Sequence, residues 1–163
     1  MAINFNSDEI FEMAEQIERN GAKFYRKAAQ NLTDAQGRKL LLDLASMEDQ
    51  HLKIFIEMQT KLTHREKEEM IFDPDQEAAM YLQAMADGHV FNIKADPATL
   101  IDKSSSVNNI FKTAIEFEKD SIIFYVGLRD MVPLEGEKNK IDAIIREEMG
   151  HIAILNRKMA SKN

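Results

Sequence analysis

Residues 10–25 read IFEMAEQIERNGAKFY and residues 110–125 read IFKTAIEFEKDSIIFY, so the chain repeats itself at an offset of 100 residues. The apolar residues of both segments recur at intervals of three and four, which is the spacing of one helix face. Glu18 in the first segment has Glu118 as its counterpart in the second. The repeat therefore predicts two equivalent helices, each with one carboxylate among core residues.

A second motif follows each of these segments at the same offset. Glu48-x-x-His51 recurs as Glu148-x-x-His151. Two residues three apart share one face of a helix, so each motif presents a carboxylate and an imidazole together. With the isolated glutamates, the two halves contain the ligand set of a carboxylate-bridged two-metal site inside a four-helix bundle.

The apolar pattern predicts an all-α protein, and its 163 residues are most simply one domain, 1–163. We expect a four-helix bundle made of two helical hairpins, at about residues 7–62 and 107–160. The first hairpin would turn at residues 31–34, and the second would break at Pro133. Short turns of this kind make the two helices of each hairpin antiparallel neighbours.

Residues 63–106 connect the two hairpins and are too many for a tight turn, so we expect structure within them. Asp73-Pro74 has the signature of a helix start, with an N-cap residue before a proline at the first helical position. Asp96-Pro97 repeats this signature and predicts a second, shorter helix. A crossover of this length makes the second and third long helices parallel.

The spacing of the two motifs can be checked against the hairpin turns. Side chains at one level of an antiparallel hairpin lie equally far from its turn. The midpoint of Glu18 and Glu48 is residue 33, and the midpoint of the second pair is Pro133. Both midpoints fall in predicted turns, so the carboxylates of each hairpin are expected at matching heights.

The motifs also predict how two metals would be held. Each Glu-x-x-His carboxylate can bridge both metals, each isolated glutamate can bind one metal terminally, and each imidazole can bind one metal. Such mixed oxygen and nitrogen ligation suits iron or manganese, and zinc can compete. We expect two iron ions, with manganese or zinc as substitutes. The six expected ligands are Glu18, Glu48, His51, Glu118, Glu148 and His151.

The alternative is an ion-paired structural core without metal. Charged side chains are almost never buried unless they are paired. Four carboxylates at one level of a core would repel one another and lose their hydration. The nearby cations Arg19, Lys23 and Lys119 are expected on other faces of their helices. Metal ions are therefore the simplest compensation for the buried charge.

Tyr25 and Tyr125 follow the isolated glutamates by seven residues, or about 10 Å along a helix axis. Two roles stay open for them. The first is structural, as packing in the core, and the second is functional, as a hydrogen bond to a ligand across the bundle or as a local redox group. Glu15, Glu116 and Glu147 also lie beside ligand positions. Because their counterparts in the repeat are not acidic, we expect them at the surface or in contact with the ligands from outside.

The composition excludes several functions. The chain has no cysteine, which rules out disulfides, cysteine-based zinc sites and iron–sulfur clusters within these residues. A formal charge of −7 without a basic stripe argues against nucleic-acid binding. Neither a secretory signal nor a membrane-spanning stretch is recognisable, so we expect no membrane contact and a cytoplasmic location.

These residues resemble the rubrerythrin branch of the ferritin-like superfamily, over about residues 8–62 and 107–160. The resemblance implies a ferritin-like fold and a non-haem di-iron site that reacts with hydrogen peroxide or dioxygen. The four segments that look like its ligand helices, in order, are Glu18-x5-Phe24-Tyr25, Glu48-x-x-His51, Glu118-x5-Phe124-Tyr125 and Glu148-x-x-His151.

The chain departs from this family pattern at two places. Full-length rubrerythrins carry a rubredoxin domain whose iron is held by cysteines, whereas this sequence has none. A reductase activity would thus need an external electron donor, such as a rubredoxin-like protein. Rubrerythrins also commonly place a further glutamate one turn after the ligand on the third helix. Here that position is Ser121, and its counterpart is Gly21, so the site looks closer to a symmetric erythrin.

Three functions are compatible with the sequence. The leading one is a di-iron oxidoreductase, the second is a ferroxidase or iron-handling protein, and the third is a metal-stabilised interaction module without turnover. We expect a homodimer or a higher homo-oligomer. Apolar residues of the connecting segment are expected to cover the bundle or to pack at a homodimer interface: Phe72, Met80, Tyr81, Leu82, Met85, Val90 and Phe91.

Overall fold

The computed structural model describes residues 7–61, 77–86 and 96–161 of the chain. These residues form helices and turns and contain no strand, which confirms the predicted all-α four-helix bundle. The elements are α1 (Ser7–Asn31), α2 (Ala35–Lys61), α4 (Glu77–Ala86), the 3₁₀ helix η1 (Pro97–Leu100), α5 (Val107–Met131) and α6 (Glu135–Ala160).

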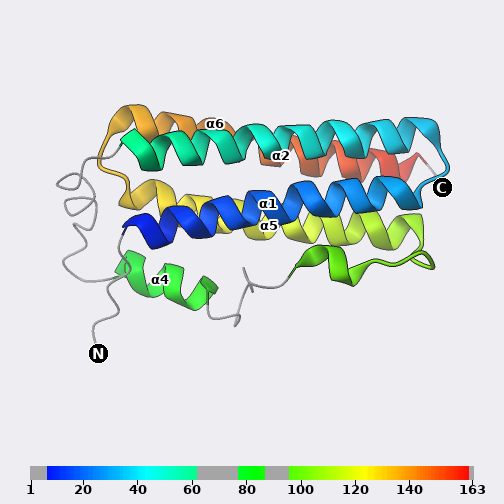
Figure 1. Cartoon of the computed structure of the whole chain (residues 1–163), viewed down its shortest axis with the longest axis horizontal. Helices are drawn as coiled ribbons and strands as arrows, with labels where there is room; N and C mark the ends of the chain where they lie inside the picture. The colour runs from blue at the N-terminus through cyan, green and yellow to red at the C-terminus, as the bar shows by residue number, and fades with distance from the viewer. Residues whose placement is uncertain (1–6, 62–76, 87–95, 162–163) are drawn as a thin grey trace.

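The four long helices pack as two antiparallel hairpins (Figure 1). In this view α1 runs beside α5, and α2 runs beside α6, and both pairs are in contact. Helices α2 and α5 point in the same direction, as the long crossover predicted. The repeat in the sequence therefore corresponds to two hairpins that face each other across the middle of the bundle.

Short polar side chains start several of these helices. The Asp34 carboxylate accepts hydrogen bonds from the backbone N–H groups of Gln36 and Gly37, at 3.2 and 3.0 Å. Ser106 caps α5 in the same way. The expected helix start at Asp96-Pro97 is confirmed, because the Asp96 side chain caps η1 with proline at its first position.

Two apolar clusters fill the ends of the bundle. One is built from the first half of α1, the second half of α2, the second half of α5 and the first half of α6. The other takes the opposite half of each helix. The six expected metal ligands lie between these clusters, at mid-height, so the apolar side chains above and below keep water away from them.

Helix α4 covers one side of α5. Leu82 and Met85 are buried in the first apolar cluster. The Tyr81 hydroxyl donates a hydrogen bond of 2.7 Å to the carbonyl oxygen of Ile123. These contacts confirm that this part of the crossover covers the bundle. Other residues named above lie outside the described part of the chain: Phe72, Asp73, Pro74, Val90 and Phe91.

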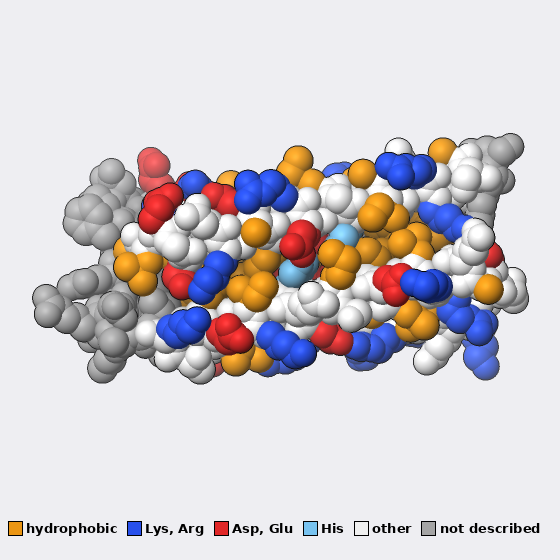
Figure 2. Space-filling model, turned by 90° about the horizontal axis from the view of Figure 1, so that it is seen from above, with side chains coloured by type: hydrophobic (Ala, Val, Ile, Leu, Met, Phe, Trp, Pro, Cys, Tyr) orange, Lys and Arg blue, Asp and Glu red, His pale blue; other side chains and the backbone are white. Residues whose placement is uncertain are grey.

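The face formed by α2 and α6 is seen in Figure 2. Charged side chains alternate with apolar ones along both helices, and histidine atoms are visible between the helices near the middle, beside a carboxylate (Figure 2). Among the residues described, no helix has both the length and the apolar composition needed to cross a membrane.

Candidate metal centre

The structure brings all six predicted ligands together in the middle of the bundle. They form two overlapping groups, and within each group one ligand atom per residue lies within 4.8 Å of the others. Glu48 and Glu148 belong to both groups. The first group is Glu18, Glu48, His51 and Glu148, and the second is Glu48, Glu118, Glu148 and His151.

Each helix of the bundle contributes to this cluster. Glu18 comes from α1 and Glu118 from α5, whereas the Glu-x-x-His motifs come from α2 and α6. No side chain of the six is more than 1% exposed. Four carboxylates so close together in a dry core need a compensating charge.

Both histidines turn their Nδ1 atoms toward the carboxylates. Nδ1 of His51 lies 3.0 Å from Glu148 Oε1 and 3.6 Å from Glu18 Oε2. Nδ1 of His151 lies 2.7 Å from Glu148 Oε2 and 3.3 Å from Glu118 Oε1. Glu148 therefore lies between the two imidazoles, while each isolated glutamate lies close to one of them.

Unpaired polar atoms show that the cluster fits metal ions. Among the described residues, nine buried side-chain nitrogen or oxygen atoms lack a hydrogen-bond partner, and seven of them belong to the six residues of the cluster. Such atoms are costly unless another group satisfies them. Carboxylate oxygens and imidazole nitrogens that face one another are the donor atoms of a metal site. The residues therefore fit a pair of divalent metals.

Burial shifts the ionisation of the cluster in the absence of metal. Burial and the charge of Glu148 raise the pKa of Glu118 to about 8. Burial and the same neighbour raise the pKa of Glu48 well above its ordinary value. For Glu148, burial acts upward, but the adjacent imidazoles of His151 and His51 lower its pKa to about 2. The metal-free cluster therefore keeps protons on some carboxylates and concentrates negative charge on Glu148.

The two tyrosines bind the isolated glutamates of the opposite hairpin. The Tyr25 hydroxyl donates a hydrogen bond to Glu118, and the Tyr125 hydroxyl donates one to Glu18. Burial raises the pKa of both phenols well above the ordinary value, so they stay protonated and remain donors. Of the two roles left open above, the structure supports the hydrogen bond to a ligand, and a redox role stays a prediction.

The three neighbouring glutamates differ in their surroundings. Glu147 Oε2 lies 2.7 Å from Nε2 of His51, so this glutamate contacts a ligand from outside. Glu116 is exposed and pairs with Lys119. Glu15 is buried and pairs with Arg19 at 2.8 Å. Sequence spacing alone could not choose among these outcomes, since all three positions flank the cluster.

Gly21 is also part of the site, although no ligand motif in the sequence includes it. A Cβ atom at this position would lie 2.7 Å from Glu48 Oε2 and 2.8 Å from the ring of Phe117. Both distances are shorter than normal contacts, so any side chain would push Glu48 or the ring aside. The missing side chain therefore makes room for a carboxylate that both groups share.

We expect Gly21→Ala to weaken binding of both metals and to destabilise the protein by about 1–3 kcal/mol, as overpacking does. Gly150→Ala is the matched control, because a Cβ there has no atom within 4 Å. This control is expected to be neutral or to stabilise by up to about 1 kcal/mol, since alanine favours a helix. Thermal melting and zinc titration of both variants test this, and equal metal affinity in the two would contradict it.

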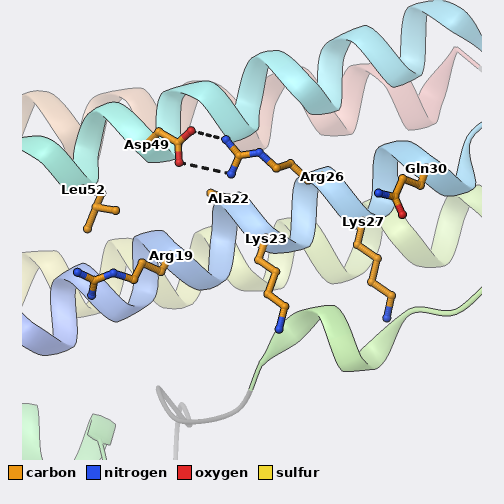
Figure 3. Close-up of a pocket in the computed structure, with 8 residues that line it drawn as sticks. All are labelled: Arg19, Ala22, Lys23, Arg26, Lys27, Gln30, Asp49 and Leu52. Atoms are coloured by element: carbon orange, nitrogen blue, oxygen red, sulfur yellow. Dashed lines mark hydrogen bonds and ion pairs between the residues drawn. The ribbon is translucent and has the colours of Figure 1, made fainter.

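A basic groove on α1 lies outside the cluster (Figure 3). Arg26 forms an ion pair with Asp49 of α2. Lys23 and Lys27 point toward the segment of η1, where Lys27 donates to the carbonyl oxygen of Ala98 at 2.5 Å (Figure 3). These cations bind neighbouring elements, so the groove serves to hold α1, α2 and η1 together.

Comparison with known proteins agrees with this geometry. The chain resembles a solved structure from Thermotoga maritima, described as a candidate ferritin-like diiron-carboxylate protein, with a TM-score of 0.76. The two share 23% sequence identity, and the alignment covers 98% of this chain and 97% of the other. This likeness confirms the ferritin-like fold. None of the curated proteins matches the chain significantly in sequence. The sequence profile of Rubrerythrin matches residues 9–160, and the chain therefore belongs to the rubrerythrin family.

Proposed function

We propose that this protein is a non-haem di-iron oxidoreductase that reduces hydrogen peroxide, or dioxygen, with electrons from an external donor. One observation carries the proposal: two groups of buried ligands share Glu48 and Glu148. This sharing is the arrangement that two adjacent metals need, since a carboxylate can bind one metal through each oxygen. Family membership and the ferritin-like fold support iron as the metal.

In this proposal each residue of the cluster has one role. The two shared carboxylates would be held in common by both metals, and each metal would also be held by one isolated glutamate and by one imidazole through Nδ1. When bound, the iron pair supplies two electrons, one from each ion, so that peroxide is reduced to two water molecules as two protons are added. The proposed ligands are Glu18, Glu48, His51, Glu118, Glu148 and His151.

The tyrosines orient the terminal carboxylates in this mechanism. Each phenol donates a hydrogen bond to one oxygen of the glutamate on the opposite hairpin. The raised pKa of both phenols keeps that proton in place at neutral pH. The other oxygen of each of these glutamates, Oε2, has no hydrogen-bond partner and is left for the metal. The phenols thus hold the carboxylates of Glu18 and Glu118 in place from across the bundle.

Four further features belong to the proposal. The electron donor is external, for example a rubredoxin-like protein, since these residues contain no cysteine to hold a second iron centre. The protein acts as a homodimer or a higher homo-oligomer. It works in the cytoplasm, and it uses neither nucleic acid nor a membrane as a partner. The net charge of −7 supports the absence of a nucleic-acid partner.

The second candidate is a ferroxidase, in which iron is the substrate and leaves as ferric product. One observation favours it: Ser121 occupies the place where rubrerythrins commonly have a further glutamate, and its hydroxyl donates to the backbone oxygen of Phe117 instead. A site with fewer ligands holds ferric iron less tightly. The two candidates therefore differ in whether iron stays in the chain after oxidation.

Single-turnover oxidation separates the two candidates. The chain is loaded anaerobically with two ferrous ions, mixed with one equivalent of hydrogen peroxide or with dioxygen, and desalted before iron is counted. For a peroxide reductase we expect faster oxidation by peroxide, two retained irons, and turnover once an electron donor is added. If dioxygen reacts as fast and the ferric iron leaves, the reductase is wrong and the ferroxidase replaces it.

A further inference from the structure

The two halves of the centre are alike on the inside. His51 and His151 occupy equivalent places in the repeat, and their rings are stacked with centroids 6.0 Å apart and planes inclined by 19°. Both rings direct Nδ1 to the same shared carboxylate, Glu148. Each ring also lies near one isolated glutamate, His51 near Glu18 and His151 near Glu118.

The halves differ at the outer nitrogen of each ring. Nε2 of His51 lies 2.7 Å from Oε2 of Glu147, whereas Nε2 of His151 is buried without a hydrogen-bond partner among the residues described. The counterpart of Glu147 in the repeat is Met47. A thioether accepts hydrogen bonds only weakly. The symmetry of the centre is therefore broken by one carboxylate.

This difference matters for metal binding. An imidazole that binds metal through Nδ1 carries its proton on Nε2, and at His51 this N–H donates to the Glu147 carboxylate. Such a bond holds the ring in one tautomer and one orientation, and it makes Nδ1 a stronger electron donor. His151 has no equivalent bond within the described residues. His51 is therefore better oriented for metal binding than His151.

We propose that Glu147 is a positioning residue that makes the two metal positions unequal. The position of Glu18 and His51 binds its metal more tightly and fills first, and the position of Glu118 and His151 fills second. This inference rests on the metal pair of the proposed function, and it adds an order of filling. The repeat also pairs Gly21 with Ser121. This difference does not create the order, because the space at Gly21 is next to Glu48, a carboxylate that both positions share.

Zinc titration of the metal-free protein tests the order without any redox activity. Zinc binding is followed by calorimetry, and the ring nitrogens of histidines labelled with ¹⁵N are followed by NMR. In the wild type we expect two affinities that differ by about 10-fold or more, as for other partners of metal-bound histidines. The first equivalent of zinc should shift Nδ1 of His51, and the second should shift Nδ1 of His151.

The repeat supplies matched variants for this titration. Glu147→Met gives both histidines the same outer residue and should bring the two affinities together, whereas Glu147→Gln keeps an acceptor and should have an intermediate effect. The exchange Glu147→Met with Met47→Glu should reverse the order, so that His151 is filled first. Glu147 is exposed, so its variants should fold, and far-ultraviolet circular dichroism checks that the exchange variant does too.

The outcomes separate this inference from the function on which it rests. Two zinc ions that bind with the same gap in affinity in the wild type and in Glu147→Met would overturn the order but leave the metal pair intact. Early filling of His151 in the wild type would do the same. Binding of fewer than two zinc ions by the wild type would contradict the metal pair itself, and the order with it.

Discussion

Removing the metal is expected to lower the melting temperature of this protein by about 10 °C. A ligand present at about 1,000 times its dissociation constant stabilises the folded state by about 4 kcal/mol. For a chain of this size, 1 kcal/mol corresponds to about 2–4 °C. The cause is specific to this site: without metal, seven buried polar atoms of the cluster have no partner. Melting curves of the loaded and the chelator-treated protein measure the difference.

A charge-matched pair of variants makes this result interpretable. Glu148→Gln removes a shared carboxylate, so added metal should no longer raise its melting temperature. Glu116→Gln removes the same charge from an exposed position, and it should keep the full response to metal. Equal melting of the loaded and metal-free wild type would instead favour the ion-paired core that the sequence left as the alternative.

The helices could be predicted from the sequence because local and long-range signals agree. The first hairpin was expected to begin at about residue 7 and to turn at residues 31–34, and α1 spans Ser7–Asn31. The second was expected to break at Pro133, and α6 begins at Glu135. Apolar spacing identified each helix, and polar caps and Pro133 marked the ends. The helix start predicted at Asp73-Pro74 lies outside the described residues and stays a prediction.

The six clustered residues could be predicted because the repeat reduces the problem to one hairpin. Once Glu18 and Glu48 are level in the first hairpin, their counterparts must be level in the second. The two hairpins then need only face each other. They must do so because the apolar face of each helix has to be buried against the other hairpin. The observed groups within 4.8 Å confirm that the predicted residues converge.

Contacts that depend on side-chain direction could not be read from spacing. Tyr25 lies two turns beyond Glu18, yet it binds Glu118 on α5. Side chains lean toward the start of their own helix, and α1 and α5 run in opposite directions, so the two side chains lean toward each other. The contact of Glu147 with His51 depends likewise on how one ring is turned. Gly21 acts by leaving space for the Glu48 carboxylate, and a sequence motif of metal ligands does not include such a position.

The metal-free protein is expected to be most stable near pH 5 and to lose stability as the pH rises toward 9. Between pH 4.5 and about 8, Glu118 is protonated in the folded protein but ionised in the unfolded chain. The folded state then binds more protons, so stability falls as the pH rises. Below pH 4.5 Glu148 reverses this trend. Its pKa is about 2 in the folded protein, so its contribution to stability is complete above pH 4.5 and is lost as the pH falls toward 2.

The histidines extend the loss of stability to higher pH. Burial by itself would lower the pKa of both rings, but the nearby carboxylates of Glu148 and Glu18 raise the pKa of His51 to about 11. The carboxylates of Glu118 and Glu148 raise the pKa of His151 to about 9. Each ring therefore stabilises the fold fully below pH 6.5 and loses this contribution as the pH rises through the folded pKa.

Metal should change this pH dependence, because its ligands must release their protons before they bind. The gap between loaded and metal-free melting temperatures should therefore widen from pH 5 to pH 9, and melts at pH 5, 7 and 9 measure it. Glu48→Gln should flatten the metal-free curve, since burial raises the pKa of the Glu48 carboxyl well above its ordinary value. Glu116→Gln should leave the curve unchanged. A gap that stays constant with pH would mean that the cluster exchanges no protons for metal, and the buried carboxylates would then be held by ion pairs alone.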